Sequence, residues 1–366
     1  MTRLLIGSAG LVLIGLILWD AFETVVLPRR VTRRLRLTSL YFEGLWGVWS
    51  LAAGLLRNRR RRDSFLSLFG PFSLILLLGT WATGLVVGFA LMYVGTGLPS
   101  APDTPPLSGP GAIFGAALYF SGSTLFTLGL GDVTPTSTAA RALTVIEAFT
   151  GFAFLALVIG YLPIIYQAFS RREVHIVMLD EWAGSPPSAG ELLRRLGRWS
   201  DLRVLDDFLA RWEQWAADLI ESHISYPVLA GFRSQHGNES WVAALTMVLD
   251  SCALVLTGID GVRPRQAWLT FAMARHVAVD LCQVLDTPPH TPADRLPRPE
   301  LDRLRAILHE SGVILASGDD AERRLTQLRR SYEPYVAALA DGLLLTLPPW
   351  LPVDGAKDNW QKTAWE

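Results

Sequence analysis

The chain has almost no net charge and very little cysteine. Its 366 residues carry 33 basic and 34 acidic side chains, a formal net charge of -1, so no global field favours nucleic acid as a partner. Cys252 and Cys282 lie on different segments without metal-ligand spacing, which predicts buried thiols in a reducing compartment. An HExxH motif, a phosphate-binding loop and a nucleophile motif are also missing. We therefore expect neither an enzyme nor an organic cofactor.

Apolar residues are plentiful but unevenly distributed. They make up 50% of the chain, in long runs before about residue 170, whereas charges recur every few positions after it. The first run, Leu4 to Trp19, extends to Leu27. A signal peptide is the alternative to an uncleaved span, but no small-x-small cleavage site follows. The basic cluster after it should stay in the cytoplasm, which places the N-terminus outside: Arg29, Arg30, Arg33, Arg34 and Arg36.

A second, aromatic stretch covers Ser39 to Leu56 and contains Tyr41, Trp46 and Trp49. Another basic cluster, at Arg57 and 59–62, follows it. Because both flanks are basic, both should be cytoplasmic, so we expect an interfacial helix with its Trp and Tyr side chains at headgroup level. The basic clusters either bind anionic lipid or act only as retention signals.

The next segments are arranged as span, short helix, loop and span. Phe65 to Val94 is long enough to cross a bilayer, and the Pro- and Gly-rich stretch 95–111 predicts an external loop. Ala112 to Phe126 is too short to span. Ala139 to Phe169 is a long helix of roughly 45 Å that ends at two arginines, Arg171 and Arg172. Irregular backbone at membrane depth persists only where protein buries it or where it lines a watery cavity.

The loop between the short helix and the last span reads TLGLGD, from Thr127 to Asp132. Glycine permits positive φ, so consecutive carbonyls can turn the same way. Four such segments around an axis would stack rings of oxygens that replace the water around a cation. The Thr127 hydroxyl would add a ring at the inner end. Asp132 would stand at the outer mouth, either concentrating cations or bracing the loop from behind.

At these residues the chain resembles the potassium-channel pore-domain family of the two-transmembrane, pore-loop type, whose signature is commonly Thr-Val-Gly-Tyr-Gly-Asp. The resemblance covers about 64–170. It implies K⁺ as the permeant ion and a selectivity filter made of Thr127, Leu128, Gly129, Leu130, Gly131 and Asp132. Leu130 departs from the family's usual Tyr or Phe, although some two-pore-domain potassium channels also carry Gly-Leu-Gly. One loop per chain predicts a homotetramer, because a closed ring needs four.

The same resemblance assigns roles on the last span. Gly151 lies where the family often has a gating hinge; close helix packing is the equal alternative. Phe152, Leu155 and Ile159 would face the cavity, and Pro163 could bend the helix near a cytoplasmic gate. Ser123 stands where many relatives place an acid behind the filter. Glu147, an acid at membrane depth, is expected to form a hydrogen bond to the back of the pore helix rather than an ion site.

Beyond residue 171 the pattern is helical, with no alternating strands and no glycine fingerprint. Residues 188–191 resemble a capping box. Trp241 to Leu256 is apolar enough for a span, but Asp250 in its middle would cost roughly 3 kcal/mol there, so we expect a buried bundle helix. The predicted helices are 200–222, 239–258, 264–285, 299–315 and 319–345.

Two polar residues of this region, His276 and Asp280, share a helix face four residues apart. With His223 or His236 they would form a metal site; the alternative is that these side chains cap and crosslink helices. Our hypothesis is a module that senses a small-molecule or ion ligand and pulls on the last span through 170–187.

Taken together, these patterns predict an all-α, multi-pass protein of the cell membrane. We expect a tetrameric pore domain of outer helix, pore helix, filter and inner helix, an extra N-terminal span and a cytoplasmic helical C-terminal domain. The expected parts are 1–63, 64–170, 171–345 and a tail, 346–366. The predicted function is a potassium-selective channel with membrane lipids and its own copies as partners. The alternatives are a weakly selective cation channel and a non-conducting membrane signalling or scaffold protein.

Overall fold

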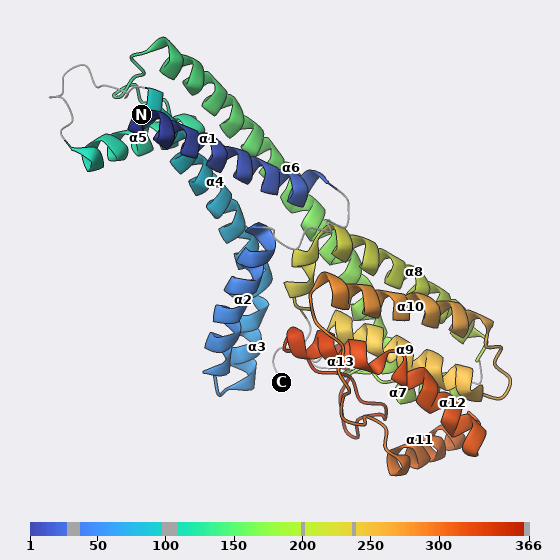
Figure 1. Cartoon of the computed structure of the whole chain (residues 1–366). Helices are drawn as coiled ribbons and strands as arrows, with labels where there is room; N and C mark the ends of the chain where they lie inside the picture. The colour runs from blue at the N-terminus through green and yellow to red at the C-terminus, as the bar shows by residue number, and fades with distance from the viewer. Residues whose placement is uncertain (28–36, 97–108, 199–201, 236–238, 362–366) are drawn as a thin grey trace. The chain divides into compact units, whose positions relative to one another are not determined.

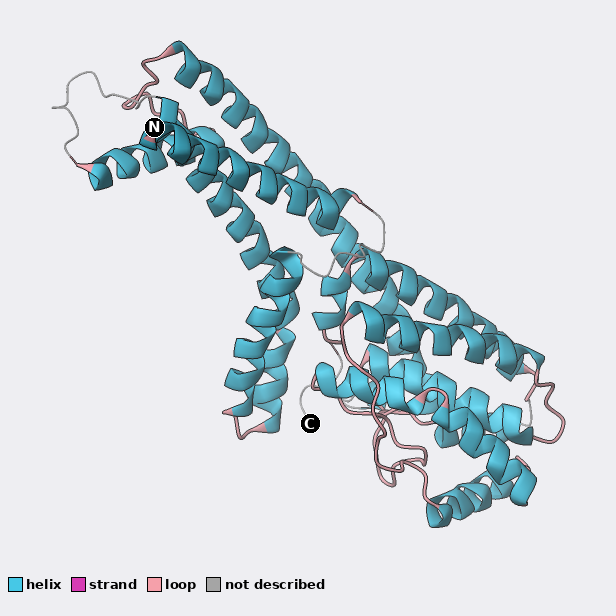
Figure 2. Ribbon diagram, in the orientation of Figure 1, coloured by secondary structure: helices cyan, strands magenta, loops and turns pink. Residues whose placement is uncertain are grey.

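The computed structural model describes residues 1–27, 37–96, 109–198, 202–235 and 239–361. These residues form helices joined by loops, without a strand among the described segments (Figure 1, Figure 2). They divide into two compact units, Met1–Tyr166 and Gln167–Glu366. The first basic cluster, most of the predicted external loop and His236 lie outside the described residues.

In the first unit, α1 (Thr2–Ala21) continues into a short π-helix, η1 (Phe22–Val26), and packs along α4 (Phe69–Thr96). Glycines allow this approach. A Cβ added at Gly10 would lie closer than 3.0 Å to the Gly88 carbonyl oxygen, and one added at Gly95 closer than 3.0 Å to Gly7. Such small residues let apolar helices make close van der Waals contact in a membrane. The predicted N-terminal span therefore packs directly on the outer helix.

A helical hairpin lies between these two helices in the sequence. It consists of α2 (Leu37–Gly54) and α3 (Arg59–Ser67), and α3 leads into α4. The Trp49 ring stacks on Phe65 at 4.4 Å, and the Tyr41 hydroxyl donates to the Ser73 carbonyl at 3.0 Å. These rings thus pack against α3 and α4, instead of all pointing outward as anchors. The second basic cluster lies at the tip of the hairpin.

A buried carboxylate joins the hairpin to the two packed helices. Asp20, at the end of α1, accepts hydrogen bonds from the Trp81 indole at 2.9 Å and from the Thr38 hydroxyl at 2.6 Å. The Thr38 amide adds a third bond. Because a buried carboxylate is costly unless its oxygens are satisfied, this arrangement fixes α1, α2 and α4 at one point.

The remaining helices of the first unit follow the expected order. The short helix is α5 (Pro110–Leu125), which begins at a proline, a residue well suited to the first turn. The last span is α6 (Thr138–Ala183), a continuous 46-residue helix with Pro163 inside it. It extends beyond the predicted end at Phe169. There Ile176, Leu179 and Ala183 are buried in the core of the second unit. The helix therefore does not end at Phe169 as expected, but continues as an amphipathic segment that packs in the bundle.

The second unit is a helical bundle. Besides the end of α6 it contains α7 (Ala189–Arg198), α8 (Val204–Ser225), η2 (Pro227–Gly231), α9 (Trp241–Gly258), α10 (Arg265–Val284), α11 (Arg298–Glu310), α12 (Asp319–Arg330), α13 (Glu333–Gly342) and η3 (Asn359–Gln361). The Ser188 hydroxyl accepts a hydrogen bond from the Glu191 amide at 3.1 Å, which is one half of the predicted capping box. The reciprocal half is replaced, because the Ser188 amide donates to the Ala183 carbonyl and the Glu191 carboxylate pairs with two arginines. The predicted helix 319–345 is two helices, because Pro334 cannot donate to a carbonyl one turn earlier and so starts a new helix.

Among the residues that the structure describes, four helical segments are long and apolar enough to cross a membrane by length and composition: Thr2–Val26, Arg60–Thr96, Thr138–Ala183 and Trp241–Gly258. The last of these is α9, whose apolar window is 94% buried inside the protein, against 17% for that of α6. Helices α7, α8, α10, α12 and α13 contact α9. A helix covered in this way has no face left for lipid, so α9 is a core helix of the bundle, as predicted.

Candidate ion pathway

The residues after α5 have an alternating backbone. Thr127, Gly129 and Gly131 have φ values of 58°, 57° and 79°, whereas the two leucines between them do not have positive φ. In a β-strand consecutive carbonyls point to opposite sides, but alternation of left-handed and ordinary residues turns them toward one side. A left-handed threonine is strained. The backbone therefore has the conformation expected of a row of carbonyl ligands.

The end of α5, the predicted pore helix, holds this segment in place. The Ser123 carbonyl accepts hydrogen bonds from the Leu128 amide at 2.8 Å and the Gly129 amide at 3.4 Å, and the Thr127 amide donates to the Thr124 carbonyl. These bonds satisfy carbonyls that the last turn of a helix leaves without intrahelical partners. In the single chain, residues 126–132 are exposed, and Leu128 and Leu130 are each 64% exposed.

Asp132, at the end of the segment, is held by two hydrogen bonds. Its Oδ2 accepts a hydrogen bond from the Tyr119 hydroxyl at 2.8 Å, and its Oδ1 accepts one from the Val133 amide at 3.0 Å. With a leucine at position 130, the Tyr119 ring has no aromatic partner in this segment, and its hydroxyl binds Asp132 instead. Phe120 turns the other way and packs edge-on against Tyr93 at 5.0 Å.

Helix α6, the predicted inner helix, has two different faces. The proposed cavity residues Phe152, Leu155 and Ile159 are exposed, and Val145 and Phe149 extend the same apolar stripe. Gly151 is buried, and a Cβ there would lie closer than 3.0 Å to the carbonyl oxygen of Leu125 in α5. Gly151 is therefore a point of close packing. Its role as a hinge and the bend at Pro163 remain predictions.

Glu147 lies one turn before Gly151 on the packed face and is fully buried. One carboxylate oxygen is hydrogen-bonded to the Ser121 hydroxyl of α5, and the other accepts from the Tyr93 hydroxyl of α4 at 2.6 Å. This is the hydrogen bond to the back of the pore helix that the sequence favoured. Tyr93 carried no signal of its own, because an isolated tyrosine in an apolar helix predicts nothing about its partner.

The two candidate metal ligands of the second unit lie together, with His276 Nε2 3.5 Å from Asp280 Oδ2. Within the described segments, however, no group of three or more His, Cys, Asp or Glu side chains is placed to hold a metal ion. His223 does not join them. Its Nε2 lies 3.2 Å from an Arg172 guanidinium nitrogen, and burial, together with that positive charge, lowers the pKa of His223 to about 3.

Arg172, one of the two arginines at which the last span was expected to end, is buried within the bundle. Its guanidinium donates to the carbonyls of Leu229 at 3.0 Å and Phe232 at 2.6 Å, and it pairs with Glu173. Burial lowers the pKa of Arg172. The last arginine of the expected basic flank is thus a structural residue that ties α6 to α8 and η2.

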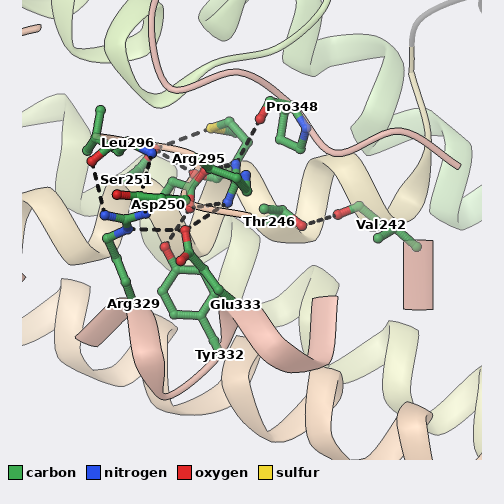
Figure 3. Close-up of polar contacts among 12 residues, drawn as sticks. Val242, Thr246, Asp250, Ser251, Arg295, Leu296, Arg329, Tyr332, Glu333 and Pro348 are labelled. Carbon is green, nitrogen blue, oxygen red and sulfur yellow. Dashed lines mark hydrogen bonds and ion pairs between the residues drawn. The ribbon is translucent and has the colours of Figure 1, made fainter. Parts of the chain in front are cut away.

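Sequence reasoning also missed an ionic cluster around α9 (Figure 3). Asp250 is fully buried and receives the Arg295 guanidinium at 2.7 Å and the Tyr332 hydroxyl at 2.5 Å. Arg295 and Arg329 both lie over the Trp350 ring, and both reach Glu333. Burial raises the pKa of Asp250. Asp250, whose charge argued against a membrane span at α9, is thus paired with Arg295 inside the bundle.

Comparison with known proteins supports the membrane assignment. Residues 107–168 match a protein family described as "Ion channel". An uncharacterized membrane protein of Bacillus subtilis (strain 168), YdjJ, is 25% identical over 256 residues, which cover 68% of this chain and 70% of the relative. No solved structure matches the chain. The resemblance expected from TLGLGD over about 64–170 is thus supported over 107–168 and at the level of an ion channel, and the described chain is an all-α membrane protein with an ion channel domain.

Proposed function

We propose that the protein is a potassium-selective channel whose pore is formed by four copies around the segment Thr127–Asp132. The observation that carries this proposal is the alternation of positive φ at Thr127, Gly129 and Gly131. It sits immediately after a helix too short to span. Rings of such carbonyls would replace the hydration shell of K⁺, which passes through as the transported ion.

Two features of the single chain support assembly into a ring. The filter segment is exposed, and so is the apolar stripe of α6 that includes Phe152, Leu155 and Ile159. Lipid could cover the apolar stripe, but irregular backbone at membrane depth must be buried by protein or line a watery cavity, so the exposed segment 126–132 is the feature that requires neighbouring copies. In a cyclic tetramer the stripe would face neighbouring copies and the cavity, whereas lipid would cover the outer helices.

The bundle of the second unit would then act on the pore through α6. This helix is continuous from Thr138 to Ala183, and Arg172 fixes its last turns within the bundle. A ligand or ion that shifts the bundle would therefore move α6. We place this unit on the cytoplasmic side, because the arginine-rich ends of the predicted spans should stay there.

Ion flux into liposomes that contain the purified protein tests the function. We expect K⁺ flux that falls strongly when Na⁺ replaces K⁺, and loss of flux in Gly129→Ala, whose φ of 57° an L-residue adopts poorly. Gly115→Ala is the matched control, since an added Cβ there also meets nothing within 4 Å but the backbone is ordinary.

The same assay separates the alternatives. Equal K⁺ and Na⁺ flux would identify a weakly selective cation channel, the expectation that Leu130 raises. No flux from assembled wild-type protein under any tested condition would favour a non-conducting membrane protein and contradict the proposal.

A further inference from the structure

The carboxyl group of Glu147 joins three helices behind the filter segment. It belongs to α6 and bonds Ser121 of α5 and Tyr93 of α4. The Ser121 hydroxyl also lies 2.9 Å from the Val86 carbonyl of α4, and Tyr93 is 3.2 Å from Thr144 of α6. None of these partners is charged. A polar cluster buried among apolar helices holds its geometry strongly, because any broken bond leaves an unsatisfied group.

A short series of contacts leads from this cluster to the filter. Ser121 and Ser123 lie in the same last turns of α5, and the Ser123 carbonyl holds the Leu128 and Gly129 amides. Position 123 itself carries a small hydroxyl and no acid. The acidic group behind the filter is therefore supplied by α6, the helix that continues into the second unit.

A second contact on the same face of α6 limits how the helix can move. Gly151, four residues after Glu147, packs against the Leu125 carbonyl at the end of α5. Residues four apart on a helix lie one above the other, so Glu147 and Gly151 contact the last two turns of the pore helix, α5, from one side. A rotation or shift of α6 at this level must break the Glu147 bonds or drag α5 with it.

We propose that Glu147 is a positioning residue that couples the inner helix to the filter through Ser121. The inference rests on the proposed channel function. When Glu147 holds Ser121, the end of α5 and the amides it anchors stay in register for carbonyl coordination. When α6 shifts, the same bonds transmit the shift to Leu128 and Gly129.

The experiment compares Glu147→Ala, Glu147→Gln, Ser121→Ala and Tyr93→Phe in liposomes of assembled protein, with wild-type flux measured first. A hydrogen bond contributes about fivefold in an equilibrium and Glu147 takes part in two between helices, so we expect the K⁺/Na⁺ flux ratio to fall by up to about 25-fold in Glu147→Ala. Glu147→Gln, which keeps an acceptor and a donor, should change it about twofold or less. Thr150→Ala is the matched control, because the Thr150 hydroxyl donates to the Ile146 carbonyl of its own helix and so does not join α6 to α5 or α4 through that bond.

A second readout separates coupling from general damage. An ion that binds the folded filter stabilises the protein by mass action, so K⁺ should raise the melting temperature of wild type above its value in Na⁺. We expect this shift to shrink by about half or more in Glu147→Ala. We also expect Glu147→Ala and Ser121→Ala to be non-additive, as contacting residues are.

The outcomes are distinct. A conducting wild type whose Glu147→Ala, Ser121→Ala and Tyr93→Phe variants all keep its flux ratio and K⁺-dependent melting shift would refute the coupling role alone. Additive effects of Glu147→Ala and Ser121→Ala would also refute it. If Glu147→Ala does not assemble, the flux ratios and melting shifts of Ser121→Ala and Tyr93→Phe decide whether the coupling role holds. A wild type that does not conduct removes the proposed function, and this inference with it.

Discussion

Gly151 of the inner helix packs so closely on the carbonyl oxygen of Leu125 that no side chain fits between them. Leu125 is the last residue of the pore helix, two residues before Thr127. The inner helix therefore contacts the pore helix at the point from which the filter segment starts. Because α6 remains helical through Gly151, the glycine serves this contact, whatever flexibility it adds.

Replacing Gly151 with alanine should push α6 away from α5. The Cβ would lie closer than 3.0 Å to a backbone carbonyl, which cannot move aside as a flexible side chain can. We expect loss of K⁺ flux and a lower melting temperature. Gly160→Ala on the same helix is the control, since its Cβ meets nothing within 4 Å, and alanine should stabilise a helix there by up to about 1 kcal/mol. Equal behaviour of the two variants would argue against the packing role.

The bond between Tyr119 and Asp132 should stabilise the outer end of the filter segment. Tyr119→Phe removes the donor of a 2.8 Å bond, so we expect altered ion selectivity in the flux assay. Asp132→Asn removes the charge but keeps an oxygen that can accept from the tyrosine. If Asp132 acts mainly as a brace, Asp132→Asn should resemble wild type more than Tyr119→Phe does. The reverse order would indicate that its charge concentrates cations.

His223 should make the second unit less stable in acid. Its pKa is lowered to about 3 by burial and by Arg172, whereas in the unfolded chain it is about 6.5. Between these values the unfolded chain binds one more proton, so stability rises with pH there and is lost as pH falls, by up to about 1.4 kcal/mol per pH unit. Above pH 6.5 neither state is protonated and the effect vanishes.

The measurement is the free energy of unfolding of the full chain as a function of pH, in wild type and in His223→Gln. Glutamine does not titrate, so the difference between the two curves isolates the histidine. We expect the wild-type curve to be steeper between pH 6.5 and about 4. Parallel curves across this range would show that His223 titrates normally in the folded protein.

Removing Arg295 should strongly destabilise the bundle. Arg295→Met leaves the buried carboxyl of Asp250 with Tyr332 as its remaining side-chain partner, and breaking a buried ion pair in this way costs about 3–5 kcal/mol. Arg303→Met is the control, because Arg303 pairs with Asp354 on the surface and such pairs contribute about 1 kcal/mol or less. In denaturant unfolding, Asp250→Leu/Arg295→Met should be more stable than Arg295→Met alone. A double variant as unstable as the single one would contradict this reading of the pair.

Local sequence was sufficient for the helices and the filter segment. Apolar runs long enough to span, a proline at the start of α5 and glycines at alternate positions each act over a few residues. Their consequences can therefore be stated without knowing the fold. Three predicted boundaries were wrong. The last span continues past Phe169 to Ala183, the helix predicted over 299–315 ends at Glu310, with Leu315 bridged to Ile259, and Pro334 starts a new helix within 319–345.

Partners far apart in sequence could not be predicted in this way. Asp20 meets Trp81, Arg172 meets His223, and Asp250 meets Arg295 and Tyr332. Each side chain alone reads as a surface charge, a topology signal or an ordinary aromatic residue. Which buried acid meets which donor depends on how the helices pack. That packing is set by many residues on the facing surfaces of both helices.

By itself, the sequence determined that the chain is helical and membrane-bound and that Thr127–Asp132 has the glycines an oxygen-lined segment requires. It did so because spanning length and positive φ are set residue by residue. Only the tertiary structure decided that Asp132 bonds Tyr119, that Gly151 touches Leu125 and that Tyr93 shares the carboxyl group of Glu147. These contacts join segments that are separate in the sequence. The sequence of one helix does not state how closely a neighbouring helix packs against it.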